Sequence, residues 1–196
     1  MTAQMNDNFL YKNKEYTLAA YRESEPYNPN LYGMETIGTG TSCWRGYVCC
    51  YSIKNNFLYL KDLYVNLLDD NGKRMDGPII NGQKPIYQGD FKLSDLGPDG
   101  MFMFFNNAYK GVNLKLDYSG SLFIADDLDD KLHIHMGFDE AWKYETVYEL
   151  VFKNGKLLST HDRSEEMNKL REEKVIVEFD FESFVVDLHH KILMET

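Results

Sequence analysis

The dipeptide Asn154-Gly155 is the feature of this sequence that most restricts its fold. It separates two strand-like runs, residues 145–152 and 156–160. An Asn-Gly pair readily supplies the two positive φ angles that a type I′ turn needs, so this part of the chain is predicted to form a β-hairpin. A hairpin joins antiparallel strands, and the prediction therefore favours an antiparallel sheet.

Several other runs of the chain have the alternating or aromatic-rich pattern of strands: residues 9–11, 15–21, 43–53, 57–67, 112–117 and 121–125. The first four of these runs come as two pairs with short polar connections, which predicts two further hairpins. The run 57–67 is apolar apart from Lys61 and Asp62, which favours a central strand with a bulge at the two charges.

The segment between residues 126 and 138 combines aspartates with histidines. Four of the five residues in 126–130 are aspartates, which predicts an exposed loop. Residues 131–138 alternate again and predict a strand that carries His133 and His135 on one face. Residues 22–41 contain prolines and glycines among polar residues, and they predict a long surface loop.

The C-terminal part of the sequence predicts a helix after His161. Asp162 and Ser164 are both candidate N-caps, and Lys174 is the expected end of the helix. Residues 175–181 alternate and predict a strand, while residues 184–194 fit either a strand or a helix. The run 101–105, Met-Phe-Met-Phe-Phe, is expected to be buried or to lie at an interface.

These patterns together predict one globular domain over residues 1–196. The expected fold is α+β and mainly antiparallel: a curved sheet, a sandwich or a partly open barrel with one or two helices near the C-terminus. The strands occur as neighbouring hairpins, which is not typical of a doubly wound parallel sheet.

The charge of the chain limits its partners. Its formal net charge is −10, which disfavours binding to nucleic acid or to an anionic membrane and favours a basic protein. Three cysteines, two of them the neighbours Cys49 and Cys50, do not form a disulfide framework. The sequence shows neither a signal peptide nor a transmembrane run, so we expect a cytoplasmic protein; a homo-oligomer remains open.

Two histidines and one glutamate form the sharpest candidate for a chemical site. His133 and His135 on one strand face would lie roughly 6–7 Å apart, near enough to share a metal ion with Glu140. This spacing resembles the first metal motif of cupins. Asp127 and Val147, however, stand where that motif has glycines, and the second cupin motif has no counterpart. A metal-dependent enzyme or small-ligand binder is the alternative that the resemblance implies.

Motifs for serine hydrolysis, phosphate binding and dinucleotide binding are missing, so the sequence favours a non-catalytic protein without a cofactor. A small, acidic, aromatic-rich chain of this kind resembles in overall character the immunity proteins of bacterial polymorphic toxin systems. The resemblance implies inhibition of a basic toxin by direct binding. The predicted partner-binding residues are four aspartates and three aromatic neighbours: Asp126, Asp127, Asp129, Asp130, Tyr118, Trp142 and Tyr144.

Overall fold

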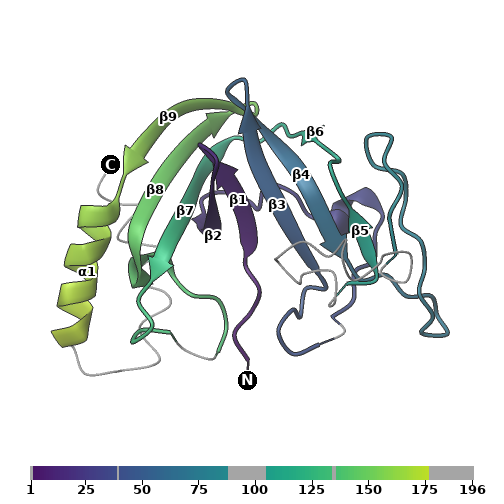
Figure 1. Ribbon diagram of the computed structural model, residues 1–196, viewed down its shortest axis with the longest axis horizontal. Helices are drawn as coiled ribbons and strands as arrows, with labels where there is room; N and C mark the ends of the chain where they lie inside the picture. Colours follow the sequence, from purple (N-terminus) through teal and green to yellow (C-terminus); the bar gives the residue numbers. More distant parts are fainter. Residues whose placement is uncertain (1, 39, 88–104, 134–135, 177–196) are drawn as a thin grey trace.

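A computed structural model of the chain describes residues 2–38, 40–87, 105–133 and 136–176. Nine strands in this part form one curved, ring-like sheet, in agreement with the predicted α+β, mainly antiparallel fold (Figure 1). The strands are β1 (Asp7–Tyr11), β2 (Lys14–Tyr21), β3 (Tyr47–Lys54), β4 (Phe57–Val65), β5 (Asn107–Tyr109), β6 (Leu114–Lys115), β7 (Gly120–Leu128), β8 (Tyr144–Lys153) and β9 (Lys156–Asp162). The helices are α1 (Ser164–Ile176) and two short 3-10 helices, η1 (Pro29–Tyr32) and η5 (Ala141–Lys143).

The order of the strands makes the sheet close on itself. Neighbours follow the order β3-β1-β2-β7-β8-β9-β4-β5, β6 pairs with β4, and β3 also pairs with β4. The pairing of β1 with β3 is parallel, whereas the other strand pairs are antiparallel. Strands β4 and β9 meet through Phe57 and Lys156. The ring is therefore closed at the end that carries the β3–β4 and β8–β9 turns (Figure 1).

All three predicted hairpins are present. Asn154 and Gly155 have φ angles of 48° and 72°, as a type I′ turn requires. The predicted bulge in the β3–β4 hairpin is also confirmed. Cys50 pairs with Asp62 and the next residue, Tyr51, pairs with Leu60, which leaves Lys61 as the extra residue.

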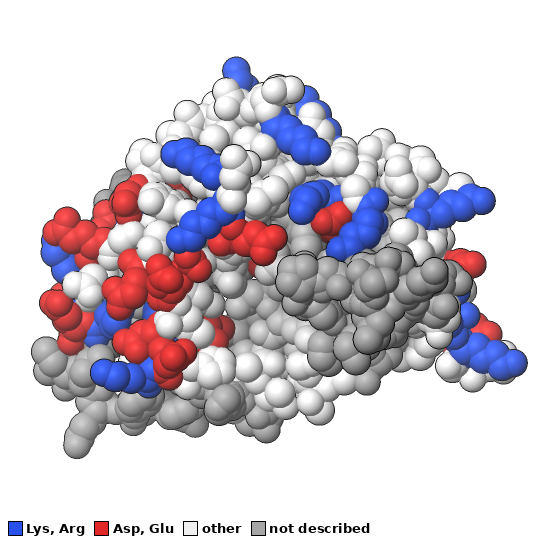
Figure 2. Space-filling view, in the orientation of Figure 1, with Lys and Arg blue, Asp and Glu red and all other residues white. Residues whose placement is uncertain are grey.

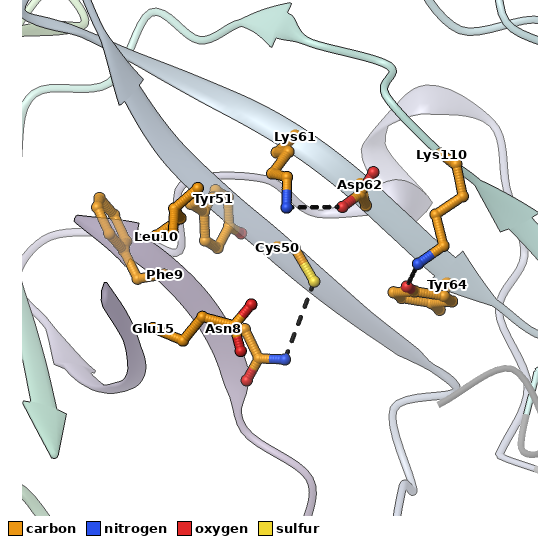
Figure 3. A pocket seen from close by; sticks show the side chains of 10 residues that line it. All are labelled: Asn8, Phe9, Leu10, Glu15, Cys50, Tyr51, Lys61, Asp62, Tyr64 and Lys110. Carbon is orange, nitrogen blue, oxygen red and sulfur yellow. Dashed lines mark hydrogen bonds and ion pairs between the residues drawn. The ribbon is translucent and has the colours of Figure 1, made fainter. Parts of the chain in front are cut away.

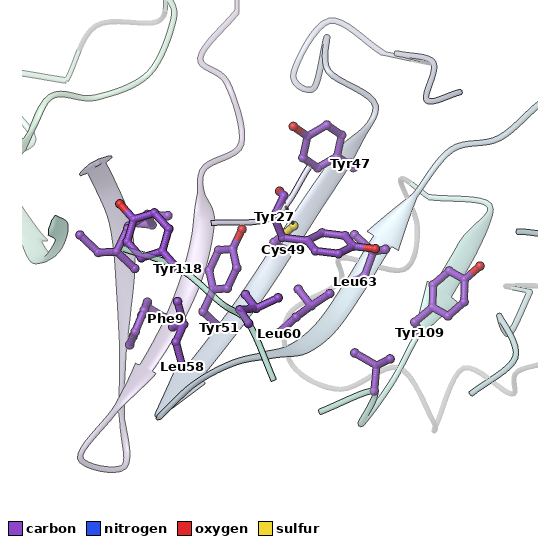
Figure 4. Close-up of a cluster of buried hydrophobic side chains, with 14 of the residues drawn as sticks. Phe9, Tyr27, Tyr47, Cys49, Tyr51, Leu58, Leu60, Leu63, Tyr109 and Tyr118 are labelled. Carbon is purple, nitrogen blue, oxygen red and sulfur yellow. Dashed lines mark hydrogen bonds between the residues drawn. The ribbon is translucent and has the colours of Figure 1, made fainter. Parts of the chain in front are cut away.

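The core of the protein lies inside the ring. Alternate strand residues point inward, and Phe9, Cys49 and Tyr51 are fully buried there (Figure 4). The same cluster includes buried leucines from several strands: Leu18, Leu58, Leu60, Leu63, Leu122 and Leu150. Side chains fill the interior, so the ring is a packed core and not an open channel.

A second core covers the outer face of β7 and β8. Helix α1 packs against β8 and η5, and its Met167 lies in a buried cluster with Phe123, Trp142 and Val147. The mostly polar sequence of this helix predicts a surface position. The helix does lie on the outside of the sheet, and the buried Met167 and Arg171 hold it there, the arginine by donating to the backbone carbonyls of Trp142 and Tyr144.

Some sequence predictions need correction. Residues 126–128 belong to β7 and not to a loop, and the described residues of 131–138 form turns and coil and not a strand. Residues 175 and 176 continue α1, so no strand begins there. The predictions for 101–104 and 184–194 lie outside the described residues, whereas Phe105 is buried. No helix in the described part of the chain has the length and apolar character needed to cross a bilayer.

Candidate functional site

Carboxylates gather on one side of the molecule, over β7, β8 and α1 (Figure 2). Residues 126–145 contain seven carboxylates and two lysines, so this segment carries half of the formal net charge of −10. Helix α1 adds more exposed acidic residues. We define the acidic face by these side chains: Asp126, Asp127, Asp129, Asp130, Glu140, Glu145, Glu165, Glu166, Glu172 and Glu173.

The end of β7 presents the first aspartates of the acidic face. Asp127 has a φ of 58°, a left-handed conformation that aspartate tolerates better than most residues, and its side chain is exposed. Asp126 forms an ion pair with Lys14 on β2 at 2.5 Å. The Asp129 carboxylate accepts the backbone N–H of Lys131 at 3.0 Å and so shapes the turn after β7.

Three aspartates of the acidic face do not pair with a lysine or an arginine of the described ranges, whereas other carboxylates do, among them Asp126, Glu145 and Glu165. Asp127, Asp129 and Asp130 form no salt bridge with any residue in the described ranges. Exposed carboxylates in such a group repel one another weakly and attract positive charge over about a Debye length, roughly 8–10 Å. The acidic face is therefore a region of concentrated negative charge.

The loop after β7 is anchored by a buried carboxylate. Both oxygens of Asp139 are used: Oδ1 accepts from Lys143 Nζ at 3.0 Å, and Oδ2 lies 2.8 Å from His133 Nδ1. Asp139 and Lys143 are buried, whereas the side chain of His133 is 28% exposed. These contacts hold the loop against η5 and fix the position of the acidic residues beside it.

The strand assumed for the metal hypothesis is not found at the described His133. His133 lies in a turn region and not on a strand, and it contacts Asp139. Glu140 accepts the indole N–H of Trp142 at 2.6 Å. His135 lies outside the described residues, and among the described ones no three His, Cys, Asp or Glu side chains form a cluster that could hold a metal. The metal site thus stays a prediction without support from the described geometry.

The three aromatic residues predicted as partner contacts lie in the core. Tyr118 is 4% exposed, and its hydroxyl donates to the backbone carbonyl of Arg22 at 2.8 Å. Trp142 and Tyr144 are buried beneath α1, and burial raises the pKa of Tyr144 to about 12. These side chains are not presented to a partner, because the apolar faces of the sheet and helix need them for packing.

A small pocket lies on the outer face of β1, β3 and β4 (Figure 3). It encloses about 60 Å³, enough for a few water molecules but not for a substrate-sized ligand. Cys50 lies in this pocket, on the opposite face of β3 from the buried Cys49. Burial raises the pKa of the Cys50 thiol to about 12, which does not suit a nucleophile at neutral pH.

Sequence reasoning missed a charged cluster at the start of β1. Asp7 is buried, pairs with Arg45 and accepts the backbone N–H of Cys49 at 2.7 Å. Nearby, Glu25 accepts the hydroxyl hydrogen of Tyr47 at 2.7 Å. A signal was available, because strand alternation puts Asp7 on the same face as the apolar Phe9 and Tyr11.

Comparisons with protein-family models, with curated proteins and with solved structures find no match to this chain.

Proposed function

We propose that this chain is a non-catalytic protein-binding module, and specifically an immunity-type inhibitor that covers a basic toxin. The observation that carries the proposal is the concentration of carboxylates on the side formed by β7, β8 and α1 (Figure 2). A surface of one sign increases the rate at which an oppositely charged protein associates, by a factor of roughly 10 or more at low salt.

Two observations on the described residues support a binding role over the metal-dependent alternative. These residues contain no cluster of three potential metal ligands, and the outer pocket is too small for a substrate. The buried ionisable groups Asp7, Asp139 and Glu149 all have cationic partners and hold loops and a helix in place. These groups serve the fold, and the acidic face remains the feature best suited to an interaction.

The experiment is a binding measurement with purified proteins. The products of the genes on either side of the one encoding this chain are produced separately and titrated into it by isothermal calorimetry. We expect a one-to-one complex with a basic partner at or below micromolar concentration. If none of the neighbouring products binds, the proposal is wrong.

Charge variants test whether the acidic face takes part. Asp127→Lys and Asp130→Lys each reverse one exposed charge on this face. Asp70→Lys is the matched control, because Asp70 is also exposed but lies in the connection between β4 and β5. We expect the first two variants to slow association about 3- to 10-fold at low salt, with a smaller effect at high salt, and the control to change it little.

A further inference from the structure

Three of the exposed large apolar side chains lie close in sequence to Arg45 or Gly137, in the loops that precede β3 and β8. Ile37 is 44% exposed, Trp44 56% and Phe138 48%. Both loops lie at the end of the ring where the N-terminus also lies (Figure 1). We call these three residues the Trp44 surface. Burial of a large apolar side chain typically contributes about 1.5–3 kcal/mol to folding, so the fold does without this contribution at all three positions.

Gln4 joins the two loops that carry this surface. Its side-chain oxygen accepts the backbone N–H of Trp44 at 2.9 Å, and its own backbone N–H donates to the carbonyl of Gly137 at 2.7 Å. The Gln4 side-chain amide also donates to the carbonyl of Thr41 at 2.8 Å. Segments distant in the sequence are therefore held side by side by hydrogen bonds, and Phe138 lies next to the bonded Gly137.

Arg45 lies between the members of the surface. Its guanidinium is 4.7 Å from the ring centre of Tyr47 and 5.7 Å from that of Phe138, and it pairs with the buried Asp7. Because Asp7 also binds the backbone of β3, the arginine cannot move without losing a buried ion pair. The residue before it, Trp44, is thereby held at a fixed place while its side chain stays exposed.

The backbone around Ile37 is fitted to the same loop. Gly46 has a φ of 73°, and a Cβ atom at this position would lie 2.4 Å from the Ile37 carbonyl oxygen. The Thr36 hydroxyl donates to the Arg45 carbonyl at 2.8 Å. Glycine is thus required where the two arms of the loop approach most closely, and the approach puts Ile37 beside Arg45.

Single exposed apolar residues are ordinary on protein surfaces, but a fixed group that includes a tryptophan has the composition of an interface hot spot. The group also borders the acidic face. Glu140 of that face lies two residues after Phe138, and the loop that contains Phe138 begins with Asp129 and Asp130. Apolar anchors beside a charged rim match the usual anatomy of a protein interface.

We propose that the Trp44 surface is the hot spot of the partner interface, and that the partner presents an apolar recess flanked by lysines or arginines. The proposal rests on the proposed function and names the part of the surface that determines affinity. The acidic face attracts the partner and its basic groups, whereas Trp44 enters the recess. A partner without basic flanks would leave the neighbouring carboxylates desolvated and unpaired, which disfavours it.

The test uses the basic neighbouring gene product in the same titration with Trp44→Ser and Phe138→Ser. Leu158→Ser is the matched control, because Leu158 is 59% exposed on β9 and lies outside both surfaces. We expect Trp44→Ser to raise the dissociation constant at least about 30-fold, mainly through faster dissociation. Leu158→Ser should change the dissociation constant less than about 2-fold. Circular dichroism of each variant checks that it is folded, and hydrogen exchange of the wild-type complex is expected to show protection at residues 41–45.

The outcomes separate the two proposals. If the neighbouring product binds the wild type and Trp44→Ser behaves like Leu158→Ser, the interface assignment is wrong and the inhibitor function stands. If no neighbouring product binds, both proposals are wrong. Sedimentation velocity of the chain alone tests the remaining case. If the chain is a dimer that Trp44→Ser dissociates, a second copy occupies this surface, and the proposal of a basic partner there is wrong.

Discussion

Asp7 and Arg45 form an ion pair that links the start of β1 to the loop in front of β3. Arg45 Nη1 donates to Asp7 Oδ2 at 3.3 Å, and Nη2 contacts Oδ1. Burial raises the pKa of Asp7 despite the attraction of Arg45, since taking a carboxylate out of water costs more than the pair returns. The pair therefore serves to fix the loop, and its contribution to stability is expected to appear only when one partner is removed.

Arg45→Met is expected to lower the free energy of unfolding by about 3 kcal/mol, because it leaves the Asp7 carboxylate buried without a cation. Methionine keeps much of the apolar length that packs on Tyr47. The double variant Asp7→Asn with Arg45→Met removes both charges, so it should recover most of that loss. Urea denaturation of the wild type, both single variants and the double variant measures the coupling. A loss for the double variant equal to the sum of the two single losses would show that the two charges are not coupled.

The pairing of Glu149 with Arg163 is expected to make the stability of the protein depend on pH. Glu149 on β8 is buried, and burial alone would raise its pKa. Hydrogen bonds from Arg163 at 2.7 and 2.9 Å, and one from Ser121, outweigh this effect and lower the pKa below its ordinary value of 4.5. A carboxyl whose pKa is lowered on folding stabilises the protein above its unfolded pKa and loses this effect as the pH falls through the folded pKa.

We therefore expect Glu149→Gln to reduce the free energy of unfolding by roughly 1–2 kcal/mol at pH 7, and by much less at about pH 3. Urea denaturation at several pH values between these limits measures the difference. Asp7, whose pKa is raised, changes the free energy of unfolding with pH in the opposite direction. Asp7 is present in both proteins, so its effect cancels when the two are compared. A difference between wild type and Glu149→Gln that stays constant with pH would contradict the assignment.

Features of the fold that neighbouring residues determine could be predicted from the sequence, whereas contacts between distant segments could not. The Asn154-Gly155 turn and the bulge at Lys61 were predictable, because a few neighbouring residues determine each of them. The place where the ring closes was not predictable, since it depends on Gly155 meeting β4: Leu58 donates its backbone N–H to the Gly155 carbonyl at 2.8 Å. No pattern within one segment contains this contact or the parallel pairing of β1 with β3.

The candidate site divides in the same way. The acidic residues near Asp127 are visible as composition, so their role as a charged surface could be predicted. The burial of Trp142 depends on which sheet face α1 covers, and Tyr118 is buried in the core inside the ring. The exposure of Trp44 depends on the hydrogen bond that its backbone N–H donates to Gln4, forty residues earlier. The strand expected at His133 was wrong because a short alternating run also fits a loop that a buried Asp139 holds in place.

Gly155 is expected to be more sensitive to substitution than a glycine of the same conformation elsewhere. Its φ is 72°, and a Cβ atom would lie 2.0 Å from the backbone oxygen of Leu116. Gly72 has a φ of 73° with no atom within 4 Å of that position, so it is the matched control. We expect Gly72→Ala to cost about 1 kcal/mol and Gly155→Ala at least about 3 kcal/mol in urea denaturation. Equal costs would show that only backbone conformation matters at the turn.

The two tryptophans of the chain are expected to behave as opposites, Trp44 as a surface residue and Trp142 as a core residue. Trp44→Ser should change the free energy of unfolding by no more than about 0.5 kcal/mol, whereas Trp142→Ser should cost about 3 kcal/mol or more. Because the chain has only these two tryptophans, Trp142→Phe and Trp44→Phe each leave a single tryptophan.

Acrylamide quenching of these two single-tryptophan variants provides an independent measurement of exposure. Trp44, 56% exposed, should be quenched readily, and Trp142, 6% exposed, should be protected. Acrylamide is uncharged, so the net charge of −10 does not bias its access as it would that of iodide. Addition of the basic partner should protect Trp44 and leave the quenching of Trp142 unchanged. If Trp44 is already protected in the isolated chain, it cannot be the anchor of the interface, because a partner would find no apolar surface there to bury.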